Sequence, residues 1–319
     1  MKITEENIIT DYLKPLTFNN INSLNLSDDI YYDNKNKIVI STDTYEEGIH
    51  FIKSSRPKFF VKKIFRASIS DIICKGSKPK VYFLSLSINK INHKWLNSFK
   101  DELSKESKKF GLYLGGGDTI RSKKLSVTIT VIGEALKKPI LRKTSHINDD
   151  LYITGNIGDS YIGLNVLLKK FNLGKFNNYF KKSFIEPVIQ QKFSEHLHKF
   201  ASASMDLSDG LILDLSRLCK ASNCGAILSF IDLPFSKNLR NISKKKKINL
   251  KNVFSRGDDY QILFTSNPKN RNLIKSISKK TNTKISRVGK IIPQKIIKMD
   301  DGDKMNNFST NKTGYIHSF

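Results

Sequence analysis

The chain has 319 residues, a length that predicts two domains, and 39% of them are hydrophobic, which is enough for a sizeable core. No apolar run approaches the roughly 18 residues of a membrane span, and residues 1–7 lack the apolar centre of a signal peptide. These features predict a cytoplasmic protein with no membrane partner. Cys74, Cys219 and Cys224 are too few for a disulfide framework or a structural zinc site.

The charge of the chain is strongly positive, with 55 Lys and Arg against 29 Asp and Glu and a formal net charge of +26. Such an excess is compatible with nucleic-acid binding. The lysines, however, are scattered through a chain rich in Asn, Ile and Phe, and they form no basic face with interleaved aromatic residues. We therefore interpret the charge as compositional and predict no nucleic-acid partner.

The hydrophobic pattern of the first half alternates between strand and helix periods. It predicts strands at 38–41, 81–88, 112–114 and 125–131, and helices at 59–74 and 93–110. Lys137-Lys138-Pro139 is the best candidate for a boundary, because proline ends the preceding strand region and the charges keep it exposed. The expected domains are therefore residues 1–138 and 139–319.

The second half mixes the same two periods. It predicts strands at 151–155, 205–206, 262–265 and 285–292, and helices at 159–171, 188–201, 209–221 and between the last two strands, with Gly225 capping the helix at 209–221. Both halves mix strands and helices, so the expected fold class is α/β or α+β with mixed sheets.

Aspartates recur where apolar or glycine-rich segments end. The motifs are Ser41-Thr42-Asp43-Thr44, Ser68-Ile69-Ser70-Asp71, Gly115-Gly116-Gly117-Asp118-Thr119, Met205-Asp206-Leu207-Ser208-Asp209-Gly210 and Gly257-Asp258-Asp259-Tyr260. Carboxylates in such positions suit several Mg²⁺ ions and a phosphate chain, because Mg²⁺ prefers oxygen ligands and is shared with substrate phosphates. The chain has neither a G-x-x-x-x-G-K-[ST] loop nor a G-x-G-x-x-G fingerprint. The motifs therefore predict phosphoryl transfer through carboxylate-held metals.

Two of these motifs also have simpler interpretations. The triple glycine before Asp118 is either a phosphate-binding turn or an ordinary glycine-rich turn. Ser208 or Asp209 could be a helix N-cap, yet a cap explains only one residue, whereas Asp206 and Asp209 would both flank a helix N-terminus that favours phosphate.

In order and spacing, these motifs resemble the thiamine-monophosphate kinase family, whose members phosphorylate thiamine monophosphate with ATP and Mg²⁺. The resemblance extends to His50, Arg142, Thr154-Gly155, Gly158-Asp159-Ser160 and Gly314-Tyr315, and so covers nearly the whole chain. It implies the two-domain fold of aminoimidazole ribonucleotide synthase, with an N-terminal domain that dimerises through its sheet. It also implies a homodimer and direct in-line transfer.

The resemblance implies a role for each matching residue. Asp43, Asp71, Asp118 and Asp209 are the expected catalytic residues, within a metal shell of Asp29, Ser41, Thr42, Asp43, Asp71, Asp118, Asp206 and Asp209. The expected ATP contacts are Gly117, Asp118, Arg142 and Ser208. The expected contacts to thiamine monophosphate are His50, Asp258 and Tyr315, an aromatic residue suited to a flat cationic ring.

The chain departs from the family pattern at three places, one of which is Ser68, where the family has an asparagine three residues before Asp71. The usual G-I-G-D-D is Asn25-Leu26-Ser27-Asp28-Asp29, without either glycine, and the expected substrate glutamate is Asp258. A degenerate homologue, or another member of the superfamily such as an aminoimidazole ribonucleotide synthase or a selenophosphate synthetase, therefore stays open as an alternative. His50 with the Ser41–Thr44 motif, and Tyr315, favour the kinase.

Overall fold

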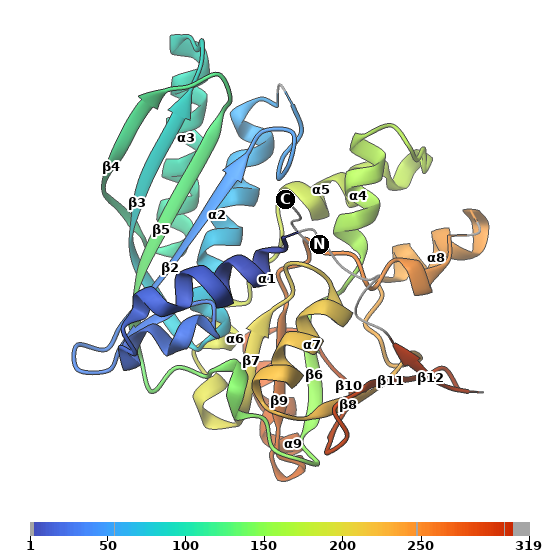
Figure 1. Cartoon of the computed structure of the whole chain (residues 1–319). Coiled ribbons are helices and arrows are strands. Elements are labelled where there is room, and N and C mark those ends of the chain that lie inside the picture. The colour runs from blue at the N-terminus through green and yellow to red at the C-terminus, as the bar shows by residue number, and fades with distance from the viewer. Residues whose placement is uncertain (1–2, 54, 247, 303, 309–319) are drawn as a thin grey trace.

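The structure is a computed structural model that describes residues 3–53, 55–246, 248–302 and 304–308. Strands of the first half form a five-stranded sheet in the order β1-β2-β5-β3-β4, and α2 and α3 lie against it (Figure 1). The bounds of these elements are β1 Tyr31–Asp33, β2 Ile38–Glu46, α2 Pro57–Cys74, β3 Ser77–Ile88, α3 His93–Phe110, β4 Tyr113–Arg121 and β5 Ser126–Ala135. Only β3 and β4 pair in parallel; the other neighbours are antiparallel.

The second half forms a seven-stranded mixed sheet in the order β12-β11-β8-β10-β6-β9-β7. Its strands are β6 Asp150–Thr154, β7 Ala201–Asp206, β8 Gly225–Ser229, β9 Ile262–Ser266, β10 Ile285–Ile292, β11 Ile297–Asp300 and β12 Met305–Phe308. The helices of this half are α4 Asp159–Leu167, α5 Asn177–Ile185, α6 Gln191–Ser194, α7 Leu211–Ala221, α8 Lys237–Lys246 and α9 Arg271–Thr281. A short helix, α1 Glu5–Asn7, and irregular helical turns precede β1.

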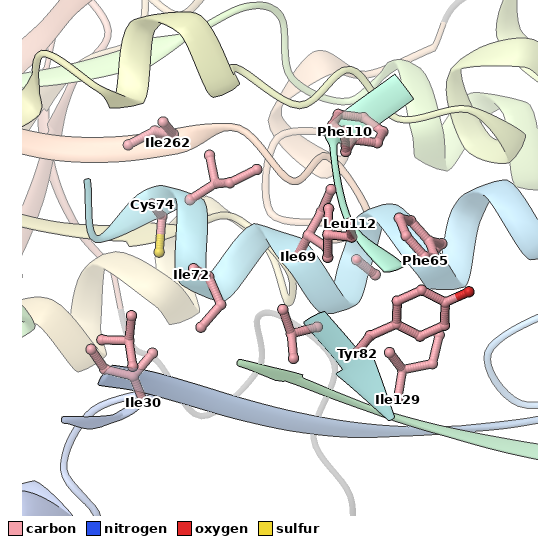
Figure 2. Packing of buried hydrophobic residues seen from close by; sticks show 14 of the residues in the cluster. Ile30, Phe65, Ile69, Ile72, Cys74, Tyr82, Phe110, Leu112, Ile129 and Ile262 are labelled. Carbon is pink, nitrogen blue, oxygen red and sulfur yellow. The ribbon is translucent and has the colours of Figure 1, made fainter. Parts of the chain in front are cut away.

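Helix α2 lies between the two sheets. Pro57 opens it at the first helical position, where a missing N–H costs nothing, and fourteen of its eighteen residues are buried. A helix that is buried nearly all round needs packing partners on both sides. Figure 2 shows these partners: Tyr82 and Ile129 of the first sheet lie on one side of α2 and Ile262 of the second sheet on the other. Polar side chains on α2 therefore lie where the two halves meet.

The structure confirms the mixed α/β class and most predicted elements. The strands expected at 38–41, 81–88 and 125–131 lie within β2, β3 and β5, and the helices expected at 59–74 and 93–110 correspond to α2 and α3. In the second half, β6, β7, β9, β10 and α9 lie where strands and a helix were expected. Within the described residues, no helix is both long and apolar enough to span a membrane.

Two local predictions are wrong, and some helices were missed. The helix expected at 188–201 consists only of the short turn α6 and a single turn at Leu197–Lys199, because Ser194 binds the carbonyl of Ile73 at the end of α2 and holds this segment against another helix. Helix α5 was not predicted. Gly225 does not cap α7 but begins β8, where a Cβ would lie 1.9 Å from the carbonyl oxygen of Gln294.

The triple glycine is also not a turn. Gly115, Gly116 and Gly117 lie within β4, paired in parallel with β3. A Cβ on Gly117 would lie 1.8 Å from the carbonyl oxygen of Leu84, so close strand packing alone requires a glycine there.

Candidate functional site

Three aspartates from distant parts of the chain converge beside α2. Asp29 precedes β1, Asp71 lies in the last turn of α2, and Asp206 ends β7. Each offers one carboxylate oxygen, and these oxygens lie within 4.8 Å of one another. We call Asp29, Asp71 and Asp206 the carboxylate centre. Its all-oxygen donor set fits Mg²⁺, which binds carboxylate, water and phosphate oxygens.

Two serine hydroxyls orient the carboxylate centre. Ser41 on β2 donates a hydrogen bond of 2.5 Å to Asp71 Oδ2, and Ser70 on α2 donates one of 2.8 Å to Asp206 Oδ2. Each hydroxyl engages one oxygen of its partner. The first sheet therefore positions Asp71 through Ser41. Helix α2 positions Asp206, at the end of β7 in the second sheet, through Ser70.

Crowding of negative charge at the carboxylate centre favours bound protons. Burial raises the pKa of Asp71 well above its ordinary value, and the charges of Asp43 and Asp206 raise it further. Burial also raises the pKa of Asp206 to about 7, and the charge of Asp29 adds to this effect. Buried carboxylates that share a site hold protons unless a cation replaces them. A divalent ion would displace these protons on binding.

Asp43, on β2 two residues after Ser41, adds a fourth carboxylate near the carboxylate centre. The Tyr45 hydroxyl donates to Asp43 Oδ2 at 3.0 Å, and Ser68 Oγ donates to the Tyr45 oxygen at 3.0 Å. Burial raises the pKa of Asp43 to about 6; the Tyr45 hydrogen bond opposes this rise, and the charges of Asp29 and Asp209 reinforce it. Asp43 therefore shares the electrostatic environment of the carboxylate centre.

Thr42 lies on the opposite face of β2. Side chains alternate along a strand, so Ser41 and Asp43 face α2 while Thr42 faces outward, with its Oγ1 2.8 Å from Thr130 Oγ1. Its hydroxyl does not join the carboxylate centre of its own chain, in contrast to the metal role expected for it.

Gly117 and Asp118 are also distant from the carboxylate centre of their own chain. In the register of the sheet, Asp43 pairs with Ile129, Ile129 with Leu84, and Leu84 with Gly117. Three strand spacings of about 4.8 Å therefore separate Asp43 from Gly117, or roughly 14 Å. Asp118 is exposed on this edge strand. If Asp118 binds a metal or ATP at a carboxylate centre, that centre must therefore belong to another copy of the chain.

The segment from Asp206 to Gly210 leads from β7 into α7, but its helix cap differs from the prediction. Neither Ser208 nor Asp209 caps the helix through its side chain. Instead Asp214, buried inside α7, accepts the backbone N–H groups of Asp209 at 3.1 Å and Gly210 at 3.0 Å. The Asp209 carboxylate contacts the Arg217 guanidinium. The Asp209 carboxylate therefore does not cap α7.

The motifs expected to bind the two substrates lie side by side. Asp258 N–H donates to the Ser208 carbonyl at 2.8 Å, and Tyr260 N–H donates to the Leu207 carbonyl at 2.7 Å. A Cβ on Gly257 would lie 2.1 Å from the Ser208 carbonyl oxygen, so this close contact requires a glycine. Backbone pairing thus joins the segment that follows Asp206 to the segment that contains Asp258.

Lys63 joins Asp258 to His50. The buried Lys63 ammonium lies 2.8 Å from Asp258 Oδ1, donates to the His50 carbonyl at 2.9 Å, and lies 3.9 Å from the centre of the Phe184 ring. Burial lowers the pKa of Lys63, and the charge of Asp258 partly restores it. Two of the three expected substrate residues therefore share one cation. Tyr315, the third, lies outside the described residues.

Arg142 lies against the loop that departs from the family pattern. The Arg142 guanidinium contacts Asp29, and the Arg142 backbone N–H donates to Asp28 Oδ2 at 2.8 Å. Its Nε is buried with no hydrogen-bond partner among the described residues. Leu24, Asn25 and Leu26 have φ of 54°, 56° and 51°. The loop thus takes left-handed backbone without glycine, which strains the two leucines more than the asparagine.

Three charged residues that sequence reasoning missed support the site: Lys63, Lys75 and Asp214. All three are buried, and they lie on or directly after helices in which most of the buried residues are apolar. Lys75 follows Asp71 by four residues, a spacing that places two side chains on one helix face. A charge within an apolar helical stretch was therefore the available signal, because such a charge needs a partner.

Comparison with known proteins identifies the class of the fold. A family model described as the AIR synthase related protein, N-terminal domain, matches residues 27–135. A solved structure described as "AaThiL complexed with AMPPCP and TMP" superposes with a TM-score of 0.84 over 99% of both chains, at 23% identity. A thiamine monophosphate kinase structure from Aquifex aeolicus gives 0.80 over 95% of this chain and 99% of that one, at 24% identity. The fold is that of the AIR synthase-related proteins.

Sequence relatives identify the family within this class. The chain is 35% identical over 302 residues, covering 92% of each protein, to the thiamine-monophosphate kinase of Buchnera aphidicola subsp. Acyrthosiphon pisum (strain APS). It is 33% identical over 241 residues to that of Escherichia coli (strain K12), covering 74% of this chain and 73% of the relative. The chain belongs to the thiamine-monophosphate kinase family, a family of enzymes.

Proposed function

We propose that this protein transfers the terminal phosphoryl group of ATP to thiamine monophosphate, producing thiamine diphosphate and ADP. The observation that carries the proposal is the carboxylate centre, in which Asp29, Asp71 and Asp206 bring oxygens from three segments within 4.8 Å. The names of the sequence relatives support thiamine monophosphate as the acceptor. The complex of a structural neighbour with AMPPCP, an analogue of ATP, supports ATP as the donor.

Phosphoryl transfer between two phosphate groups requires that the substrates are positioned in line and that their negative charges are neutralised. A phosphate oxygen of the acceptor is already nucleophilic, so we infer in-line attack on ATP with no strong base and no phosphoenzyme. Several Mg²⁺ ions would supply neutralisation of the two phosphate groups and of the charge that develops between them. The carboxylate centre, Asp43 and Asp209 would hold these ions, while Ser41 and Ser70 keep the carboxylates oriented.

At the acceptor end, the Lys63–Asp258 pair is suited to a molecule with a cationic ring and an anionic phosphate. Asp258 can face the cationic thiamine ring, and the Lys63 ammonium fixes its carboxylate. The shorter side chain of Asp258, compared with the glutamate usual in the family, is held by both Lys63 and the Tyr260 hydroxyl, 3.1 Å from Oδ1. His50 and Tyr315 are the other proposed substrate contacts.

At the donor end, the unpartnered Arg142 Nε and the Ser208 segment are the proposed contacts to ATP. Gly117 and Asp118 are too far across the sheet to join them in one chain. We infer that the protein is a homodimer and that Asp118 and Gly117 contribute to the site of the other copy. The exposed side chains along β4, including Tyr113, Leu114 and Ile120, support pairing through this sheet.

The domain division at residues 138 and 139 is part of the same proposal. Strands of the first sheet all precede residue 136, and those of the second begin at Asp150. We propose that residues 1–138 bind ATP and dimerise, that residues 139–319 complete the site, and that the enzyme works in the cytoplasm.

A product assay tests the proposed function. Purified protein is incubated with ATP, Mg²⁺ and thiamine monophosphate, and the nucleotides and thiamine phosphates are separated by chromatography. We expect thiamine diphosphate and ADP in equal amounts, and neither when EDTA is present. ADP without thiamine diphosphate would instead favour another activity of the superfamily.

A further inference from the structure

Lys75 is a buried cation at the edge of the carboxylate centre. It is the first residue after α2, and its side chain is 0% exposed. The ammonium makes contacts of 2.7 Å to Asp28 Oδ1, 2.8 Å to the Ser204 carbonyl and 3.5 Å to Asp29 Oδ2. An ammonium has three donors, and a buried charge must be paired and hydrogen-bonded. Lys75 meets this requirement with Asp28, the Ser204 carbonyl and Asp29, and Asp29 belongs to the carboxylate centre.

The two acidic partners of Lys75 differ in what else they bind. Asp28 is fully engaged, because its oxygens also accept the N–H groups of Asp29 at 2.9 Å and of Arg142 at 2.8 Å. Asp29 Oδ2, by contrast, has no hydrogen-bond partner among the described residues, although Lys75 Nζ lies 3.5 Å away. Asp28 therefore anchors the ammonium, and the charge of the ammonium acts on Asp29.

The pKa shifts of Asp29 and Lys75 agree with the contacts that the two side chains make. Burial alone would raise the pKa of Asp29, but the charges of Arg142 and Lys75 outweigh burial and lower it. Burial would lower the pKa of Lys75, and the charge of Asp28 reverses that effect. Asp29 thus has a fixed counter-charge that Asp71 lacks.

We propose that Lys75 is a resident cation of the carboxylate centre: together with Arg142 it neutralises Asp29 before any ion binds, and it confines divalent ions to the Asp71 and Asp206 side of the centre. A fixed positive charge a few ångströms from the ion position repels a divalent ion. Without nucleotide, the protein would then bind divalent ions weakly and would hold them firmly only with the phosphates of ATP. Lys75 acts here as a positioning residue. The inference rests on divalent-ion binding by the carboxylate centre, which is part of the proposed function.

Binding of Mn²⁺ without nucleotide tests this role, with free Mn²⁺ measured by electron paramagnetic resonance. Lys75→Met keeps the length of the side chain and removes its charge, and we expect the dissociation constant for Mn²⁺ to fall about tenfold. Because that variant leaves Asp28 buried without its cation, Lys75→Met/Asp28→Asn is measured in parallel. We expect the double variant to fold and to bind Mn²⁺ about threefold more tightly than the wild type.

A matched control removes another ion pair of α2. Lys62→Met/Glu186→Gln eliminates a 2.6 Å pair that contacts no member of the carboxylate centre, and we expect no change in Mn²⁺ affinity. Circular dichroism checks the fold of each variant. Folded Lys75 variants that bind Mn²⁺ no more tightly than the wild type would overturn the role of Lys75 and leave the metal centre standing. Failure of all proteins, wild type included, to bind Mn²⁺ with or without AMPPCP would overturn the metal centre and this inference together.

Discussion

At the scale of single residues, the site combines carboxylates that retain protons with cations that are permanently paired. Asp43, Asp71 and Asp206 all have raised pKa values, and burial is the largest cause for each. Asp29 is the exception, since Arg142 and Lys75 lie beside it. Metal-free protein therefore has a partly protonated centre, and both metal binding and folding depend on pH.

Stability of the metal-free protein should fall as the solution becomes more alkaline. The folded-state pKa values of about 6 for Asp43 and about 7 for Asp206 lie above the ordinary 3.8, so the folded state binds protons that the unfolded state releases. This stabilisation is complete below the ordinary pKa and is lost as pH rises through 6 and 7. We expect Tm in EDTA to be about 5 °C or more lower at pH 8 than at pH 5.5.

Thermal unfolding followed by circular dichroism measures this effect, with Mg²⁺ in a parallel series. Mg²⁺ should recover the lost stability at pH 8 and have little effect at pH 5.5, because protons then occupy the carboxylates. Asp206→Asn should flatten the pH dependence in EDTA. A Tm in EDTA that is equal or higher at pH 8 would contradict the protonated centre.

At the scale of elements, periodicity predicted α2 well because its apolar residues continue over about five turns, although the predicted helix began at residue 59 and missed the first two residues, Pro57 and Lys58. Sequence reasoning failed at β4 for a physical reason. Glycines have no side chains, so the triple glycine shows none of the apolar and polar alternation that identifies a strand. The contact that requires a glycine at position 117 is with Leu84, thirty-three residues earlier in the chain. Tertiary contacts of this kind are invisible in a local pattern.

The position of β4 makes a prediction about two copies of the chain. Asp118→Asn and Asp71→Asn should each abolish activity in a homodimer. If Asp118 serves the other copy, a heterodimer of the two variants contains one site with both aspartates intact. Random mixing makes half of the dimers heterodimers with one active site of two, so we expect about a quarter of wild-type activity.

Co-expression of the two variants with different tags, followed by the product assay on the mixed population, measures this complementation. Asp118→Asn mixed with Asp118→Asn serves as the control. A mixed population as inactive as its parents, with heterodimers present, would show that Asp118 does not act across the interface.

At the scale of the whole molecule, the site exists because α2 brings two sheets together. Asp71 and Ser70 lie on this helix, Ser41 comes from the first sheet and Asp206 from the second. The order of the motifs predicted the family, and the short apolar segments before Asp43, Asp71 and Asp206 indicated these aspartates as candidate metal ligands. Neither could predict Lys75 or the distance of Asp118 from the centre, since these depend on the packing of α2 and on strand order.

The central claim is that the carboxylate centre carries the kinase reaction. Its most direct measurement is the rate of thiamine diphosphate formation by Asp71→Asn compared with the wild type, with ATP and Mg²⁺ saturating and folding confirmed by circular dichroism. We predict a rate lower by about a thousandfold or more with the fold retained, because the change removes a metal-binding charge from the site where negative charge develops. A folded Asp71→Asn enzyme within about tenfold of the wild-type rate would contradict the account.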